Sequence, residues 1–333
     1  MKRNILYAGT LLLAMTVSGP AHSDDPEQAA RDTANGAQAC IDIWPFWWEI
    51  GDASAMAVGE TAPTDETDPG QDKEMAIASA SKWIYAAYVA ERRGGDLRGY
   101  DIQFLTLESG YHSLTTCSAD DINTVDDCLA YGDNGYRSSD AIGKFAYNGG
   151  HFEAHASNYP GLPTSAAVNP IDLGAYYDAD LKAEINDVLG TSVVRSYAQP
   201  LLPGGVRSTL GLYADFLRAI MSDDLQMYSL LGTFQVCAGQ MGCSSGTVLN
   251  SPIPAHWNYS IGHWVETDND NAYSNAGVRG FYAWISKYKD LYGIVGRDVN
   301  PRANETEDTS VSWDSVQCGQ LIRKAYITGV PQT

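Results

Sequence analysis

The chain has 333 residues, of which 44% are hydrophobic and only 19% charged, a composition that predicts a globular protein and excludes a disordered one. Asp and Glu number 41 against 21 Lys and Arg, which gives a formal net charge of −20. A charge of this sign and size repels nucleic acid and anionic lipid surfaces, so we exclude a protein that binds a phosphate backbone.

The N-terminal segment has the pattern of a cleaved secretory signal. Residues 2–3 (Lys-Arg) precede an apolar run at 5–17, and residues 21–23 (Ala-His-Ser) offer small outer residues to a signal peptidase. We expect residues 1–23 to be removed and residues 24–333 to form a single catalytic domain, periplasmic or extracellular. The apolar run falls short of the roughly 20 residues that cross a bilayer, and we expect no membrane anchor.

The first two thirds of the chain are expected to be mainly helical. The aromatic residues Trp44, Phe46, Trp47 and Trp48 come first and predict a core strand, with the rim of a cleft as the alternative. Apolar residues at helical spacing then predict three helices, the last of them capped by Ser208 or Thr209. These helices are expected at residues 75–95, 178–190 and 208–221.

The last third of the chain predicts an antiparallel meander followed by a helix. Short segments rich in Tyr, Trp, Val and Ile are separated by Asp, Asn, Gly and Lys turns between residues 258 and 299. Residues 314–329 predict a closing helix. Because no βαβ alternation occurs, the sequence favours an α+β fold over a doubly wound one.

All six cysteines follow the signal, and in an oxidising compartment they are expected to form disulfides. No Cys-x-x-Cys spacing occurs, and we expect neither a metal nor a cofactor. Two pairs flank short loops and are expected to bridge locally, which leaves one pair to join the start of the fold to its end. The expected disulfides are Cys40–Cys318, Cys117–Cys128 and Cys237–Cys243.

The stretch Ser79-Ala80-Ser81-Lys82 is the most informative about chemistry. On a helix, a separation of three places Ser79 and Lys82 on one face about a turn apart. The amine can take the hydroxyl proton if burial lowers its pKa, and the helix N-terminus favours an oxyanion. A second Ser-x-x-Lys match, Ser286 to Lys289, lies in a strand turn, where this spacing does not bring the side chains together.

Two further stretches resemble motifs of the serine β-lactamase and penicillin-binding superfamily, which includes family VIII carboxylesterases. Residues 145–151 (Phe-Ala-Tyr-Asn-Gly-Gly-His) resemble its second motif, and residues 273–277 (Tyr-Ser-Asn-Ala-Gly) resemble its third. With Ser79 and Lys82 as the first motif, the order agrees, and the resemblance spans roughly residues 75–329. It implies a β-lactamase/transpeptidase-like α+β fold, an antiparallel sheet flanked by helices, with a mostly helical lobe at roughly 98–205 inserted between the α/β parts.

The resemblance also implies roles for residues of this chain. Ser79 would be the nucleophile, with Lys82 and Tyr147 sharing the general-base and general-acid work. A tyrosine with an ordinary pKa near 10 is a poor base at neutral pH, and a cationic lysine beside it would favour the ionised phenol. The backbone N–H groups of Ser79 and Val278 would form the oxyanion hole.

Two departures from the family pattern bear on the substrate. Gly149 stands where the strict second motif has asparagine, so an amide that would hold a substrate carbonyl is missing. Asn275 stands where the third motif begins with Lys or His, and the missing cation disfavours β-lactams and peptides, which carry a carboxylate. Arg279 is a candidate replacement, because it lies two residues beyond Gly277. The residues expected to bind substrate are Asn148, Asn275, Gly277 and Arg279.

Two other patterns offer rival interpretations. Residues 242–246 match Gly-x-Ser-x-Gly, the nucleophile elbow of α/β-hydrolases, but that elbow requires a helix after the serine, and two prolines follow here. We expect Ser244 to lie in a disulfide-closed loop. His151 and His155, four residues apart, could bind zinc on a helix. A structural or cleft-lining role is favoured for His151, and a hydrogen-bonded, partly buried one for His263.

These patterns together predict a secreted serine hydrolase that acts through an acyl-enzyme, with a carboxylic ester as the favoured substrate. A β-lactamase, or a D-amino-acid peptidase or amidase, of the same fold is the first alternative. A catalytically silent binding protein is the second, and the joint retention of Ser79, Lys82 and Tyr147 argues against it. The expected partner is a small or oligomeric ester or amide.

Overall fold

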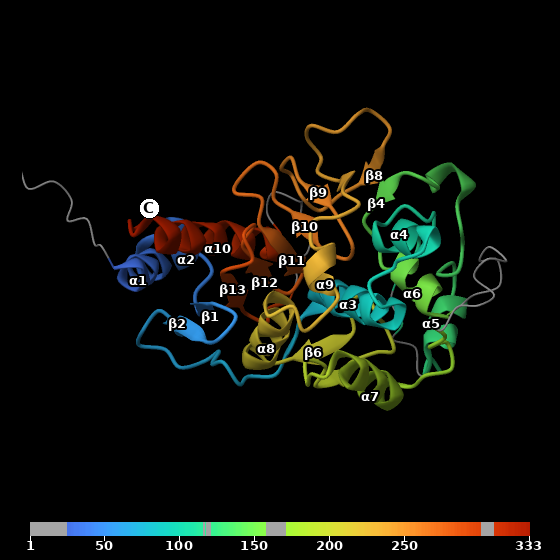
Figure 1. Cartoon of the computed structure of the whole chain (residues 1–333), viewed down its shortest axis with the longest axis horizontal. Coiled ribbons are helices and arrows are strands. Elements are labelled where there is room, and N and C mark those ends of the chain that lie inside the picture. Colours follow the sequence, from blue (N-terminus) through green and yellow to red (C-terminus); the bar gives the residue numbers. More distant parts are fainter. Residues whose placement is uncertain (1–24, 116, 118–120, 158–170, 301–309) are drawn as a thin grey trace, which may run out of the picture.

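The computed structural model describes residues 25–115, 117, 121–157, 171–300 and 310–333 (Figure 1). The expected signal peptide lies outside them. The helices are α1 (Pro26–Gly36), α2 (Gln38–Ile41), α3 (Ser81–Arg93), α4 (Gly99–Leu105), α5 (Val125–Ala130), α6 (Gly150–Ser157), α7 (Asp178–Leu189), α8 (Leu210–Met221), α9 (Met227–Leu230) and α10 (Val311–Thr328), with 3₁₀ turns η1 (Ala78–Ala80) and η2 (Ser139–Ala141). The strands are β1 (Phe46–Gly51), β2 (Met56–Ala62), β3 (Met75–Ala76), β4 (Phe145–Ala146), β5 (Ser196–Tyr197), β6 (Val206–Ser208), β7 (Val236–Cys237), β8 (Val248–Asn250), β9 (Asn258–Tyr259), β10 (Trp264–Val265), β11 (Tyr273–Gly277), β12 (Phe281–Ile285) and β13 (Tyr292–Gly296).

The main sheet has eight strands in the order β2-β1-β13-β12-β11-β10-β9-β7, and every neighbouring pair is antiparallel. Strands β9 to β13 follow one another along the chain, so the predicted meander is confirmed. Val295 and Gly296 are consecutive on β13 and therefore face opposite sides of the sheet. Val295 lies against Gly319 of α10, whereas Gly296 lies against Leu210 of α8. Helices thus cover both faces, as Figure 1 shows, and the predicted α+β class is confirmed.

A second, helical part lies beside the sheet. Helix α3 is buried along residues 81–90, and a helix apolar on all sides is one that other elements surround. It contacts α7 and α9, while α6 contacts α4 and α5. In Figure 1 the helices α4 to α7 gather on the side of the molecule away from α1 and α2.

The helix predicted at residues 75–95 begins later than the sequence suggests. Met75 and Ala76 form β3 and pair with Ser208 and Arg207 of β6, and η1 precedes the first turn of α3. The pairing partner lies more than 130 positions away, so local helical spacing gives no sign of it. The predicted end of the helix is confirmed, since Gly94 closes it in the left-handed conformation at φ 60°.

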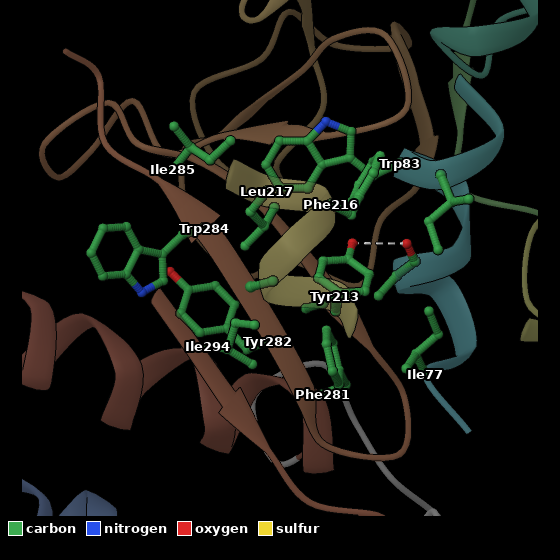
Figure 2. Packing of buried hydrophobic residues seen from close by; sticks show 14 of the residues in the cluster. Ile77, Trp83, Tyr213, Phe216, Leu217, Phe281, Tyr282, Trp284, Ile285 and Ile294 are labelled. Carbon is green, nitrogen blue, oxygen red and sulfur yellow. Dashed lines mark hydrogen bonds between the residues drawn. The ribbon is translucent and has the colours of Figure 1, made fainter. Parts of the chain in front are cut away.

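The side chains of α8 pack against the sheet and against the start of α3 (Figure 2). Tyr213 lies edge-on to Phe281 of β12, with the ring centres 4.8 Å apart. Its hydroxyl donates a hydrogen bond to the carbonyl of Ala80 at 3.1 Å. Helix α8 therefore connects the sheet to the turn that carries Ser79.

Thr209 is the N-cap of α8, because its side chain accepts a hydrogen bond from the backbone N–H of Leu212 at 3.2 Å. Thr209→Ala is expected to lower the free energy of unfolding by about 1 kcal/mol, the usual cost of losing such a cap. Urea denaturation measures it. Thr209→Ser keeps the hydroxyl and should retain most of the stability; equal losses in both variants would contradict a capping role.

The six cysteines pair as the sequence predicts: Cys40–Cys318, Cys117–Cys128 and Cys237–Cys243. The first bond joins α2 to α10, close to where α1 also contacts α10, and ties the start of the described chain to its end. None of the helices in the described ranges is long and apolar enough to cross a membrane.

Candidate active site

Ser79 lies in the 3₁₀ turn η1, between β3 and α3. The preceding residue, Ala78, has a φ of 46°, a conformation that is strained for a residue with a Cβ and that concentrates at functional sites. Two hydrogen bonds hold the carbonyls on either side of Ser79. Ser81 Oγ donates to the carbonyl of Ala78 at 2.6 Å, and Tyr213 donates to the carbonyl of Ala80. The strained turn is thus fixed by its surroundings.

Gly277 lets strand β11 pass directly beside this turn. A Cβ at this position would lie 2.1 Å from the carbonyl oxygen of Ile77, so any side chain here would push the strand away from the serine. Gly277 therefore acts through close backbone packing. The next residue along the chain, Val278, lies at the cavity that Ser79 borders.

Lys82 lies within hydrogen-bond distance of the serine hydroxyl. Its Nζ lies 3.0 Å from Ser79 Oγ and 3.2 Å from the carbonyl oxygen of Pro203, and the residue is 3% exposed. Burial lowers the pKa of Lys82 to about 7. In a substantial fraction of the molecules, Lys82 is therefore a neutral amine at neutral pH, and this amine can accept the proton of Ser79.

Tyr147 completes the group. It lines the same cavity as Ser79, its ring centre lies 4.8 Å from Lys82 Nζ, and the ring stacks on Trp264 with centres 5.3 Å apart. Burial raises the pKa of Tyr147 to about 12. The expectation that a cationic lysine favours the ionised phenol does not fit this environment, because burial disfavours both charges. The phenol stays protonated at neutral pH and is a proton donor.

Ser79 and Tyr147 open into a cavity of about 310 Å³ whose walls are largely apolar. Strand β11 and the segments around residues 250 and 310 supply most of the other walls. The lining residues are Ser79, Tyr147, Asn250, Ser251, Pro252, Ile253, Trp264, Ala276, Val278, Ser310 and Ser312. The hydroxyl of Ser79 and the phenol of Tyr147 therefore lie at an accessible cavity, and the buried amine of Lys82 lies directly behind them.

Asn148 and Asn275, expected to bind substrate, do not line this cavity. Asn148 Oδ1 accepts hydrogen bonds from the N–H groups of Leu114 and Gly150, at 3.1 and 2.9 Å. Asn275 is fully buried, and its Nδ2 donates to the carbonyl of Gly262 at 2.7 Å. Both amides bond to backbone groups inside the fold, and substrate contacts by these two residues stay a prediction.

Arg279 is likewise turned to another partner. Its guanidinium forms an ion pair with Asp298 and donates to Asn300 Oδ1 at 3.1 Å. Asp298 also accepts a hydrogen bond from the N–H of Ala76 at 3.4 Å. Arg279 is paired with Asp298 and is not among the residues that line the cavity, and its contact with a substrate carboxylate stays a prediction.

Two residues of this region carry no signal in the sequence. Trp264, in β10, supports the ring of Tyr147, but a tryptophan in a predicted strand is most simply a core residue. Pro203 contacts Lys82 through its backbone carbonyl, an atom that every residue possesses. Only the Pro-Gly-Gly turn at residues 203–205 marks the position, and it predicts nothing about its neighbours.

The rival patterns have structural roles. His151 is buried, with Nδ1 2.7 Å from Ser109 Oγ and Nε2 3.0 Å from the carbonyl of Ala146. His155 bonds instead to Tyr85 and Asp101, and the described residues hold no group of metal-ligating side chains. His263 is buried and hydrogen-bonded, as expected.

The Gly-x-Ser-x-Gly match and the second Ser-x-x-Lys match are also accounted for. Ser244 comes directly after Cys243 and therefore lies just outside the loop that the Cys237–Cys243 disulfide closes, not inside it as expected; strand β8 comes next rather than a helix. Ser286 Oγ bonds to Asp290, whereas Lys289 donates to the carbonyl of Tyr228. Neither serine forms a contact of the kind that joins Ser79 to Lys82.

No family model matches the sequence, and no curated protein matches it. Solved structures share the fold. A candidate β-lactamase from Bacteroides dorei is 17% identical, with a TM-score of 0.60 over 86% of this chain and 95% of that one. The D-amino acid amidase from Ochrobactrum anthropi is 10% identical, with a TM-score of 0.60 over 90% and 98%. A penicillin binding protein from Bacillus halodurans is 12% identical, with a TM-score of 0.55 over 85% and 98%. The chain therefore shares its fold with these β-lactamase, amidase and penicillin-binding protein structures.

Proposed function

We propose that this protein is an exported serine hydrolase that acts through an acyl-enzyme, with carboxylic esters as its substrates. The observation that carries the proposal is the 3.0 Å approach of Lys82 Nζ to Ser79 Oγ beside an open cavity. A nucleophile within reach of a base is the arrangement that covalent catalysis requires. The three disulfides support export.

In the proposed reaction, Ser79 Oγ attacks the ester carbonyl carbon while its proton passes to the neutral amine of Lys82. The tetrahedral oxyanion is stabilised by the backbone N–H groups of Ser79 and Val278. The Tyr147 hydroxyl gives its proton to the leaving alkoxide and regains one from the Lys82 ammonium. Water then attacks the acyl-enzyme with the same groups in reverse roles, which releases the acid and restores Ser79.

An uncharged ester is favoured over a β-lactam by the position of Arg279. Its ion pair with Asp298 holds the guanidinium away from the cavity, and Asn275 is engaged with Gly262. The cavity walls instead present Trp264, Ile253 and Val278 to the substrate. These apolar surfaces suit a short acyl chain better than a carboxylate.

Exposure to a fluorophosphonate is expected to add one phosphonyl group, found by mass spectrometry on the peptide that contains Ser79. The protein should also hydrolyse nitrophenyl acetate or butyrate faster than nitrocefin or an amino-acid nitroanilide. Rapid hydrolysis of nitrocefin would show that the substrate class is a β-lactam rather than an ester, and rapid hydrolysis of the anilide would show that it is an amide. A protein that neither reacts with the fluorophosphonate nor turns over any of the substrates would be a silent binding protein.

A further inference from the structure

Pro203 occupies the space that Gly149 leaves open beside Lys82. A Cβ on Gly149 would lie 2.7 Å from Pro203 Cγ and 3.1 Å from Leu114 Cδ2. With the ring in this place, the carbonyl of Pro203 points to Lys82 Nζ at 3.2 Å, inside the protein. The loop therefore supplies a hydrogen-bond acceptor for the amine of Lys82.

The loop that carries Pro203 is tightly folded. The N–H groups of Gly204 and Gly205 both bond to the carbonyl of Leu201, and that of Ala198 bonds to the carbonyl of Gly205. Gly205 packs so closely that a Cβ would lie 2.4 Å from the carbonyl oxygen of Gln199. Because the loop is held together by its own backbone hydrogen bonds, we expect an anchor at one of its residues to fix the position of Pro203.

Glu153 is a side-chain anchor of this loop. It lies on α6, fully buried, and its Oε2 accepts a hydrogen bond from the N–H of Leu202 at 3.0 Å. Leu202, which precedes Pro203, is itself fully buried. Burial raises the pKa of Glu153 well above its usual value, which favours the uncharged acid, and the contact with Leu202 needs only an oxygen that accepts a hydrogen bond. A glutamine can do the same.

We infer that Glu153 is a positioning residue, which anchors the 199–205 loop so that the Pro203 carbonyl holds the Lys82 amine against Ser79. The inference rests on the proposed function for its effect on turnover, but the contact between the loop and Lys82 exists without a substrate. Helix α6 begins at Gly150, so one short segment carries Tyr147, the gap at Gly149 and the anchor at Glu153.

Glu153→Leu keeps the volume and removes the acceptor. Its kcat for nitrophenyl acetate is expected to fall at least about tenfold with KM little changed, since a displaced catalytic group lowers turnover more than binding. A loosened loop also admits water to Lys82, so the acid limb of the pH–rate profile should move to higher pH. Glu153→Gln should retain kcat and the profile within about twofold, because the amide oxygen replaces the acceptor.

The pKa of Lys82, followed by NMR on lysine-labelled protein, gives a readout that needs no turnover. It should rise in Glu153→Leu and stay near the wild-type value in Glu153→Gln and in Val58→Ala, a core variant of β2 at the far edge of the sheet. An unchanged Lys82 pKa in folded Glu153→Leu would overturn the inference. A shifted pKa in a protein that hydrolyses nothing would support it and reject the proposed function.

A second pair of variants tests the same loop from the other side. Gly149→Ala places a methyl group against Pro203, and kcat should fall as the loop is pushed from Lys82. Pro203→Ala removes the Cγ that the methyl would meet, and the double variant should recover most of the lost activity. Additive losses would contradict the proposed contact.

Discussion

Ser79→Ala is expected to lower kcat/KM for nitrophenyl acetate by about 10⁴-fold or more, because the acyl-enzyme cannot form without this hydroxyl. The oxyanion donors and the cavity remain in the variant, so a small residual rate above that of water is consistent with the mechanism. Reaction with the fluorophosphonate should disappear at the same time. Steady-state kinetics and intact mass measure the two losses.

Ser312 provides the matched control, because its hydroxyl lines the same cavity. Its Oγ lies 3.1 Å from Ser310 Oγ at the start of α10 and forms no contact with Lys82 of the kind that Ser79 makes. Ser312→Ala should keep turnover within a few fold of the wild type. Full activity in Ser79→Ala would contradict the assignment of Ser79 as the nucleophile. Loss of activity in Ser312→Ala alone would assign that role to Ser312 instead.

The parts of the fold that follow from local sequence were predicted well. Turn residues separate the strands β9 to β13 in the sequence. The helices α7, α8 and α10 are marked by apolar residues at helical spacing and by residues at their ends, all within a short stretch of chain. The start of α3 was not predicted correctly, because Met75 pairs with Ser208, and that partner is brought near only by the folded chain. Distant pairing of short segments leaves no local pattern.

The site divides in the same way. Ser79 and Lys82 lie together because they are only three positions apart in the chain. The motif at residues 145–151 pointed to Tyr147 as the third side chain of the site. The ion pair between Arg279 and Asp298 was not predicted, since the sequence does not show that these two residues lie together. Glu153 was absent from the prediction because its partner is a backbone N–H 49 positions away. Family motifs point to the side chains that we propose to be reactive, whereas the groups that hold these side chains in place are visible only in the folded structure.

Lys82→Met, which replaces the buried amine by an apolar chain of similar length, should lower kcat/KM by about 10³-fold, the usual contribution of a general base. Wild-type activity should rise with pH through about 7, where Lys82 loses its proton and becomes able to accept that of Ser79. The residual activity of the variant should lack this limb. If activity still rises with pH near 7 in Lys82→Met, the rise belongs to the titration of another group.

The same substitution should stabilise the protein, which separates loss of the base from loss of the fold. The pKa of Lys82 is about 7 in the folded chain, below its ordinary value of 10.5, so unfolding takes up a proton at neutral pH and burial of the amine costs stability. This cost is full below pH 7 and disappears as pH rises toward 10.5, and near pH 7 it amounts to roughly 4 kcal/mol. Lys82→Met removes it, so the melting temperature of the variant should exceed that of the wild type at pH 6 and approach it at pH 10. A variant that melts lower than the wild type at pH 6 would show that the amine stabilises the fold, and its lost activity could not then be assigned to catalysis.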